Sequence, residues 1–178
     1  MPRLTAQALK DRYAAGVRDF AGLDLAGADL FEADLREIDL RESNLSEIYW
    51  PYANLSRANL QNCQVSNAQC SDAKLYQADL SNANLQGANL SRANLRFANL
   101  QGANLSGANL EGANLYKANL SEANLTGANL SRANLEEAKL SGAQLSGCNF
   151  FRCRGVNVSD ALVDETTILP DGYRGESS

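Results

Sequence analysis

The side chains with the clearest capacity for chemistry are four cysteines and 21 carboxylates, in a chain of 178 residues that contains no histidine. The lack of histidine removes the commonest general base and metal ligand, and with it most Ser-His-Asp, Cys-His and zinc-hydrolase sites. No C-x-x-C pair occurs, and all the cysteines fall at inward positions of a repeat: Cys63, Cys70, Cys148 and Cys153. We interpret them as small buried residues, and we predict no disulfide, no metal and no cofactor.

The formal net charge is −5, and it is distributed unevenly. Between Asp19 and Ile48 there are nine acidic residues and only two arginines, Arg36 and Arg41. Because phosphate contacts require a basic excess, we expect no direct binding to nucleic acid. No cationic stretch precedes an apolar run at the N-terminus, and no window approaches the ~20 apolar residues of a membrane helix. The expected location is therefore the cytoplasm, without a membrane anchor.

A repeat of five residues, approximately A-(N/D)-L-x-x, fills most of the chain. In steps of five from Phe20 to Phe150, leucine holds 22 of 27 positions, and alanine holds 20 of the 27 positions two residues earlier. On an α-helix a step of five rotates a side chain by about 140°, so the leucines would share no face. In an extended chain side chains alternate in direction, so the alanine and the leucine of one unit, two residues apart, point the same way. Because five is odd, a straight strand would point the next leucine to the opposite side, so the chain must turn once per unit to keep every leucine inside. The pattern therefore predicts a polygonal coil around a leucine core.

Units such as Ala88-Asn89-Leu90-Ser91-Arg92 and Ala103-Asn104-Leu105-Ser106-Gly107 resemble those of the pentapeptide-repeat family, and the resemblance extends from Phe20 to Phe150. It implies an all-β fold: a right-handed quadrilateral β-helix, or β-solenoid, with about 20 residues per coil. The apolar spacing within Arg3 to Ala15, closed by Gly16, predicts a short N-terminal capping α-helix. At about 4.8 Å between stacked strands, the rod is roughly 30 Å long. A closed, convex rod has no cleft for an acid/base pair, and no phosphate-binding loop is evident. We therefore predict no catalytic residue and no enzymatic activity.

A coil of 20 residues places Trp50 directly against Cys70, the one cysteine at a leucine position. Tryptophan is too large for a leucine position, and a packed core tolerates little excess volume, so we expect the small Cys70 to compensate for it. The following Pro51 has no N–H group. We expect the backbone ladder to be interrupted there, at a distorted corner.

The two ends of the chain depart from the repeat. Residues 1–18 are expected to form the N-terminal cap, and residues 19–168 the β-helix, whose last coil is degenerate after residue 152. The register slips near Gly155, and residues 169–178 form a C-terminal tail. The segments Leu9–Gly16 and Thr167–Gly172 resemble the end caps of cyanobacterial family members. We expect such caps to cover the unpaired strand edges at the two ends of the rod.

The outward positions are where we expect function. Stacking by 20 aligns Tyr76, Arg96 and Tyr116, so the arginine lies between two aromatic rings. The candidate partner-binding surface, called the aromatic-basic face, comprises Arg57, Lys74, Tyr76, Arg96, Phe97, Tyr116 and Lys117. A self-stabilising surface ladder without a partner is an equally weighted alternative. On another edge, glycines at 87, 107, 127 and 147 leave a smooth column.

The second candidate surface is an acidic ring around one coil. Its members occupy the same position in four successive units: Glu32, Glu37, Glu42 and Glu47. Solubilising charge is the favoured interpretation, and docking of a basic partner is the sharper alternative.

The leading hypothesis is a non-enzymatic, regulatory protein–protein interaction scaffold that binds an unidentified protein partner through one outer face. The alternative is a DNA mimic that binds a topoisomerase or another DNA-binding protein, as some family members do. The acidic end and the rod shape favour mimicry, and the modest net charge opposes it. A structural spacer is a third possibility. We expect a monomer or an end-to-end homodimer.

Overall fold

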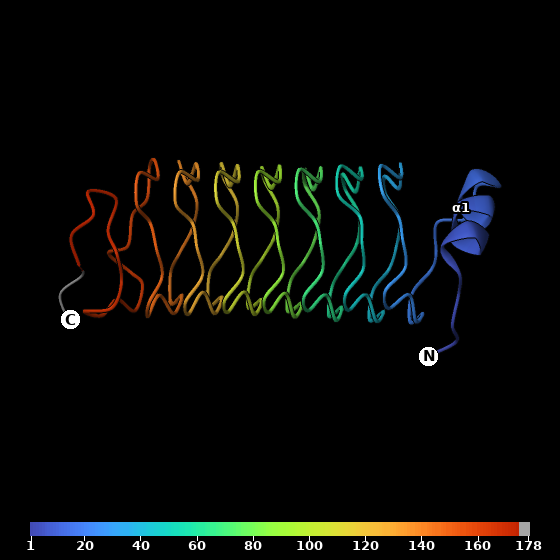
Figure 1. Ribbon diagram of the computed structural model, residues 1–178, viewed down its shortest axis with the longest axis horizontal. Helices are drawn as coiled ribbons and strands as arrows, with labels where there is room; N and C mark the ends of the chain where they lie inside the picture. Colours follow the sequence, from blue (N-terminus) through green and yellow to red (C-terminus); the bar gives the residue numbers. More distant parts are fainter. Residues whose placement is uncertain (175–178) are drawn as a thin grey trace.

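The computed structural model describes residues 1–174 and shows a rod of stacked coils, with one helix at its N-terminal end (Figure 1). Helix α1 spans Ala6–Ala14. It begins where the Thr5 side chain accepts a hydrogen bond from the Ala8 N–H, at 3.2 Å. Leu9 is fully buried against the core, and the Tyr13 hydroxyl donates to the Arg36 carbonyl oxygen at 2.9 Å. The helix therefore covers the open end of the first coil. No helix in residues 1–174 is long and apolar enough to cross a membrane.

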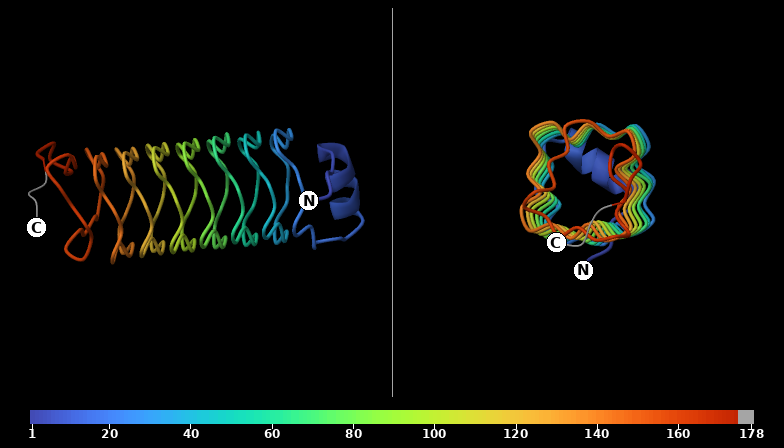
Figure 2. Two further views of the ribbon diagram at one scale, coloured as in Figure 1. Left: turned by 90° about the horizontal axis from the view of Figure 1, so that it is seen from below. Right: turned by 90° about the vertical axis from the view of Figure 1, so that its left-hand side faces the viewer.

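The β-structure consists of isolated bridges, all parallel except the one between Ile168 and Arg174, and residues 1–174 contain no longer strand. Over most of the rod the bridged residues are 20 apart, as in Asn84 with Asn104 and Asn104 with Asn124. The Leu85 N–H donates to the Asn104 carbonyl at 2.7 Å, and the Asn104 N–H donates to the Ala83 carbonyl at 2.9 Å. Seen end-on, the coils superpose with a four-cornered outline (Figure 2). The extended sides are shorter than ordinary strands because each five-residue unit also contains a turn.

The turn in each unit is closed by a backbone hydrogen bond, such as that from the Ala88 N–H to the Leu85 carbonyl at 3.0 Å. The third residue of the turn has a positive φ, as type II turns require. Gly87 holds this position with φ 66°, and Asn82 holds it with φ 56°. Within residues 1–174, 18 non-glycine residues have positive φ. The solenoid thus imposes the left-handed conformation on many side chain types that disfavour it.

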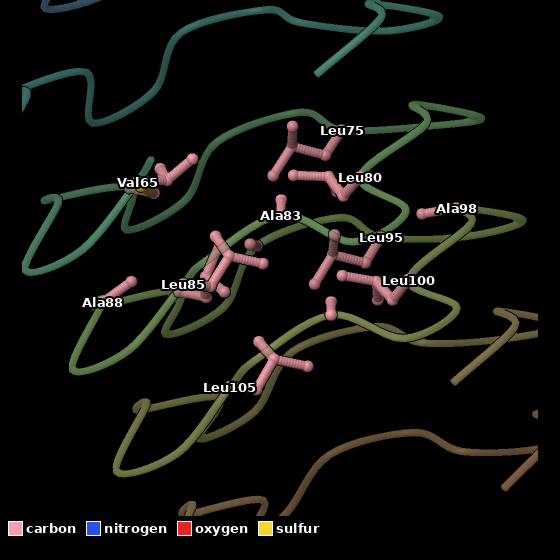
Figure 3. Close-up of a cluster of buried hydrophobic side chains, with 14 of the residues drawn as sticks. Val65, Leu75, Leu80, Ala83, Leu85, Ala88, Leu95, Ala98, Leu100 and Leu105 are labelled. Carbon is pink, nitrogen blue, oxygen red and sulfur yellow. The ribbon is translucent and has the colours of Figure 1, made fainter. Parts of the chain in front are cut away.

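The core is a stack of leucine and alanine columns. Leu75 lies against Leu95, and Leu80 against Leu100, one coil apart (Figure 3). The Trp50 indole N–H donates to the Cys70 sulfur at 2.6 Å, and both side chains are 1% exposed. The expected contact between these two residues is confirmed.

The expected interruption at Pro51 is wrong. The Pro51 carbonyl accepts from the Glu32 N–H at 3.0 Å, and the Tyr52 N–H donates to the Ser71 carbonyl at 3.0 Å, so the ladder continues on both sides. In other units the N–H of this turn position donates to the Asn or Asp side chain two residues earlier, as Ser56 does to Asn54. Tyr49 stands at that position before Pro51 and has no such acceptor. Proline is tolerated because this N–H takes no part in bonding between coils.

The repeated asparagines hold neighbouring coils together. Asn104 Oδ1 accepts from the Ser106 N–H within its own turn, at 3.1 Å, while Asn104 Nδ2 donates to Asn84 Oδ1 in the previous coil, at 3.1 Å. An ionised aspartate can only accept hydrogen bonds. The aspartates are concentrated at the start of the rod, at residues 19, 24, 29, 34 and 39. Only Asp39 bridges to an earlier repeat unit, at Asp19; the other four have no repeat unit one coil before them. The position therefore accepts either residue at the start of the rod and favours asparagine inside it.

At the C-terminal end the 20-residue register shortens. Gln144 bridges to Leu162, and Asn149 bridges to Ile168. The backbone of Gly155, with φ 68°, lies so close to Glu136 that a Cβ atom would be 2.6 Å from the Glu136 Cα. Ile168 then forms an antiparallel bridge with Arg174, so the chain folds back across the end of the last coil. The final residues of the predicted tail, 175–178, lie outside the described residues.

Candidate protein-interaction surface

A continuous ladder of three aromatic rings runs along one outer edge of the rod. Phe97 lies between Tyr76 and Tyr116, with ring centroids 5.7 Å and 5.6 Å apart and nearly perpendicular planes. The three residues belong to neighbouring columns of successive coils, and the Phe97 N–H donates to the Tyr116 carbonyl at 2.9 Å. Edge-to-face pairs of this kind are favourable arrangements of aromatic rings. Phe97 is 37% exposed, so the ladder faces solvent.

The cations of this edge pack against the rings. The guanidinium of Arg96 lies 5.7 Å from the ring centroids of both Phe97 and Tyr116. Sequence reasoning placed Arg96 between the two tyrosines, whereas the structure places Phe97 there. The left-handed turn position directs the Phe97 ring between Tyr76 and Tyr116, and the Arg96 side chain packs on Phe97 and Tyr116 instead of lying between the two tyrosines.

Lys117 and Glu137 fix the C-terminal end of the ladder. The Tyr116 hydroxyl donates to Glu137 Oε1 at 2.9 Å, and Lys117 Nζ lies 3.2 Å from Glu137 Oε2 and 5.2 Å from the Tyr116 ring centroid. Hydrogen bonds with Tyr116 and Glu137 raise the pKa of Lys117 above its ordinary value. The hydrogen bonds from Tyr116 and Lys117 lower the pKa of Glu137. The tyrosine is therefore oriented by a charged network.

The remaining two predicted members stand apart from this cluster. Arg57 lies toward the acidic end, where its guanidinium pairs with Glu37 at 3.4 Å and donates to Gln77 at 3.2 Å. Lys74 is exposed on the adjoining side of the rod, in the column of Asn54 and Asn94. The structure thus brings together five of the seven candidates: Tyr76, Arg96, Phe97, Tyr116 and Lys117. A surface hollow of about 280 Å³ adjoins them, lined by Arg36, Glu37, Ser56, Arg57 and Tyr76.

The four glutamates of the acidic ring occupy successive turns around the coil. All are exposed and have φ values between 53° and 60°. Glu37 pairs with Arg57, as described, and the other three have no ion pair in residues 1–174. Because each lies at a different turn, the ring presents its charges in several directions and does not converge on one site.

A second aromatic cluster was missed by sequence reasoning. Phe31 stacks on Tyr49, with centroids 6.2 Å apart, and meets Tyr52 edge-on at 5.9 Å. The three rings are 42%, 43% and 52% exposed, respectively. Beside them a groove of about 360 Å³ separates α1 from the first coil, with Lys10 and Tyr13 among its lining residues. The 20-residue columns align Phe31 with Pro51 and Glu32 with Tyr52, so Phe31 and Tyr52 come together only when neighbouring columns are considered jointly.

The four cysteines are buried free thiols. Burial raises the pKa of Cys63 and Cys70 to about 12 and that of Cys153 to about 11, and it raises the pKa of Cys148 as well. Thiolates carry the nucleophilic and metal-binding chemistry of cysteine, so these side chains are unreactive at neutral pH. In the part of the chain that the structure describes, no group of three or more Cys, Asp or Glu residues is placed to hold a metal ion.

Comparison with known proteins gives a consistent picture. The family model for pentapeptide repeats matches in eight copies, over residues 19–46, 53–92, 88–127 and 113–151. A search of curated proteins found no match.

Solved structures of pentapeptide repeat proteins are similar to this chain. One is HetL, involved in heterocyst differentiation regulation in the cyanobacterium Nostoc sp. strain PCC 7120, with 28% identity, coverage of 97% of this chain and 100% of HetL, and a TM-score of 0.40. Another is alr5209 from Nostoc PCC 7120, with 30% identity, coverage of 89% and 93%, and a TM-score of 0.31. A trypsin-treated variant of QnrB1, a plasmid-mediated fluoroquinolone resistance protein, has 19% identity, coverage of 82% and 79%, and a TM-score of 0.49.

Proposed function

The chain belongs to the pentapeptide-repeat family, and we propose that it is a non-enzymatic scaffold that binds a protein partner through the Tyr76–Phe97–Tyr116 ladder. In this proposal the rod is a right-handed quadrilateral β-helix located in the cytoplasm, and it regulates the protein partner that it binds. The fold itself is a β-solenoid with one short helix. Its task must therefore be carried by outward side chains on a rigid core.

The observation that carries this proposal is the continuity of exposed aromatic rings with arginine beside them. Tyrosine, arginine and other aromatic residues dominate the binding energy of protein interfaces. Tyr76, Phe97 and Tyr116 contact each other across successive coils, and Arg96 packs on two of the rings. Because the ladder is ordered before any partner binds, little side-chain entropy is lost on association.

The DNA-mimic alternative has less support. Three of the nine carboxylates between Asp19 and Ile48 are paired with arginines, which leaves six to act as phosphate substitutes. From Tyr49 onward, 11 acidic residues are matched by 10 basic ones. A mimic of duplex DNA needs negative charge along its whole length, since DNA carries one charge per ~1.7 Å of axis. Here the excess is confined to the first two coils.

The proposal is tested by affinity capture from the native organism's lysate with two matched triple variants. One replaces Tyr76, Arg96 and Tyr116 by alanine, and the other replaces Gln86, Ser106 and Thr126, which hold the same turn position on the smooth glycine edge. We expect the first variant to lose a partner that the wild type and the second variant retain. Equal capture by all three proteins, with unchanged circular dichroism, would rule out this face.

A further inference from the structure

One edge of the rod changes character from end to end. It contains two adjacent columns, which begin at Phe31 and Glu32 and end at Phe151 and Arg152; we call it the Phe31–Phe151 edge. Backbone hydrogen bonds join its successive coils throughout, from the Glu32 N–H to the Pro51 carbonyl at one end to the Arg132 N–H and the Phe151 carbonyl at the other. Its second column carries, in order, Glu32, Tyr52, Asp72, Arg92, Gly112, Arg132 and Arg152. The edge is therefore acidic and aromatic at one end and basic and aromatic at the other.

The charges in the middle of this edge are satisfied within the chain, whereas those at its ends are not. Arg92 pairs with Asp72 at 2.7 Å, and Arg132 lies 3.8 Å from Glu111. Glu32 and Arg152 have no ion pair in residues 1–174, and both are exposed.

Each end also presents an exposed phenylalanine. Phe31 is 42% exposed and Phe151 is 39% exposed. The Arg152 guanidinium lies 5.0 Å from the Phe151 ring centroid. Both ends thus combine an unpaired charge, of opposite sign, with an apolar ring.

This edge is complementary to itself when reversed. Residues 32 and 152 are six coils apart, or about 29 Å at ~4.8 Å per coil. A two-fold axis at Arg92 places Glu32 of one copy opposite Arg152 of the other and Phe31 opposite Phe151. The same operation sets Tyr52 against Arg132, a cation–π pair. We propose that the Phe31–Phe151 edge binds a second copy of this chain, side by side and antiparallel.

Two further features suit this pairing. The flanking column sets Asp34 of one copy beside Arg154 of the other, and both are exposed. At the axis Arg92 of each copy lies opposite its own equivalent, and each of these arginines is already paired with Asp72 of its own chain at 2.7 Å. The residues that flank Arg92 include the small Ser71, Ser91 and Gly112. Every contact away from the axis occurs twice, as a closed isologous interface requires.

The pairing surface is a strip only two columns wide, and we expect it to bury less than the ~800 Å² per partner of standard interfaces. Its charges are exposed and therefore screened by salt. The dimer is accordingly weak and salt-sensitive. It differs from an end-to-end dimer in length, because side-by-side rods are no longer than one rod.

The test is sedimentation equilibrium of the full chain up to about 1 mM protein, at about 0.02 M and 0.5 M NaCl, with small-angle scattering to measure length. We expect a concentration-dependent dimer of single-rod length at low salt that dissociates at high salt. Glu32→Arg and Arg152→Glu should each weaken self-association about tenfold or more. Both fit the turn, because Arg57 and Glu137 already hold this position with φ 59° and 57°.

Mixing the two variants provides the decisive control. In the mixed pair each end contact again joins an acidic with a basic side chain, so the dimer should return. Glu122→Arg, the same change on another edge, and the alanine triple at Tyr76, Arg96 and Tyr116 should dimerise like the wild type. A monomer under all conditions, a dimer of doubled length, or a dimer unaffected by Glu32→Arg would overturn the proposal, and none of these outcomes bears on the partner-binding ladder.

Discussion

The side-chain amide of Asn99 donates a hydrogen bond of 3.1 Å to the carboxylate of Asp79 in the preceding coil. Burial opposes the charged form of Asp79, but hydrogen bonds from Ser81, Gln61 and Asn99 prevail and lower its pKa. The Asn99 Oδ1 atom accepts from the Gln101 N–H within its own turn, at 3.3 Å. Asparagine thus performs two tasks here, and aspartate could perform only the second.

We predict that Asn99→Asp lowers the free energy of unfolding by about 1–3 kcal/mol at neutral pH, because a donor is replaced by a second carboxylate. Urea denaturation checks this value. The matched control is Asn94→Asp, which keeps the turn acceptor but bridges to Lys74 and should change stability by less than about 0.5 kcal/mol. The loss in Asn99→Asp should shrink as the pH falls toward ~4, where the carboxylates become protonated. Equal losses of stability in the two variants would show that the side-chain hydrogen bond from Asn99 to Asp79 does not stabilise the coil.

Gly155 and Gly107 share a positive φ but differ in the space around them. A Cβ on Gly155 would lie between 2.5 and 2.8 Å from the Glu136 Cγ, Cα and N atoms, whereas one on Gly107 would meet nothing within 4 Å. We predict that Gly107→Ala costs about 1 kcal/mol from backbone strain alone, and that Gly155→Ala costs about 2–3 kcal/mol or more. Urea midpoints of both variants measure the difference. Similar midpoints would show that the last coil shifts freely.

Trp50 and Cys70 should behave as one packing unit. Trp50→Leu leaves a cavity and is expected to cost about 2–4 kcal/mol, and Cys70→Leu overpacks the site and should cost about 1–3 kcal/mol. The double variant places leucine at both positions, as in the regular repeat, so its loss should be clearly smaller than the sum. Because Trp50 is the only tryptophan, unfolding must be followed by circular dichroism. Additive losses would show that the two side chains are independent.

Asp164 holds Thr166 in place by hydrogen bonds, and Thr166 in turn joins the last coil to Gly147 of the preceding one. The Asp164 Oδ1 atom accepts from the Thr166 hydroxyl and N–H, and the Thr166 Oγ1 atom accepts from the Gly147 N–H at 2.7 Å. Hydrogen bonds, first of all from the Thr166 side chain, lower the pKa of Asp164 to about 2. An unfolded aspartate has a pKa of about 3.9. The stabilisation from this group is therefore complete above about pH 4 and is lost as the pH falls toward 2.

We predict that the hydrogen-exchange protection factor of the Gly147 amide falls between pH 5 and pH 2. In Asp164→Asn this protection should be lower at pH 5 and nearly independent of pH. Asp160→Asn, a neighbouring exposed carboxylate, should retain the wild-type dependence. A protection factor in the wild type that does not change with pH would show that Asp164 does not hold this coil.

Contacts between residues of one 20-residue column could be predicted from the sequence, whereas contacts between different columns could not. Trp50 against Cys70, and Tyr76, Arg96 and Tyr116 in one column, follow from a spacing of 20 residues. The insertion of Phe97 between the tyrosines depends on how far a left-handed turn residue swings toward the next column. The Phe31–Tyr49–Tyr52 cluster joins residues at three different positions of the unit, so no single column reveals it. The regular ladder around Pro51 depends on which N–H groups bond between coils.

By itself, the sequence determined the five-residue unit, the inward leucines and alanines, and the family to which the chain belongs. It could do so because burial acts on every unit alike and leaves a strict period in the residue types. Only the tertiary structure decided which outward side chains touch. Those contacts depend on turn dihedrals that residue type does not specify, since Glu, Arg, Phe and Tyr all hold the left-handed position here. The solenoid imposes that conformation, and the conformation in turn assembles the aromatic ladder.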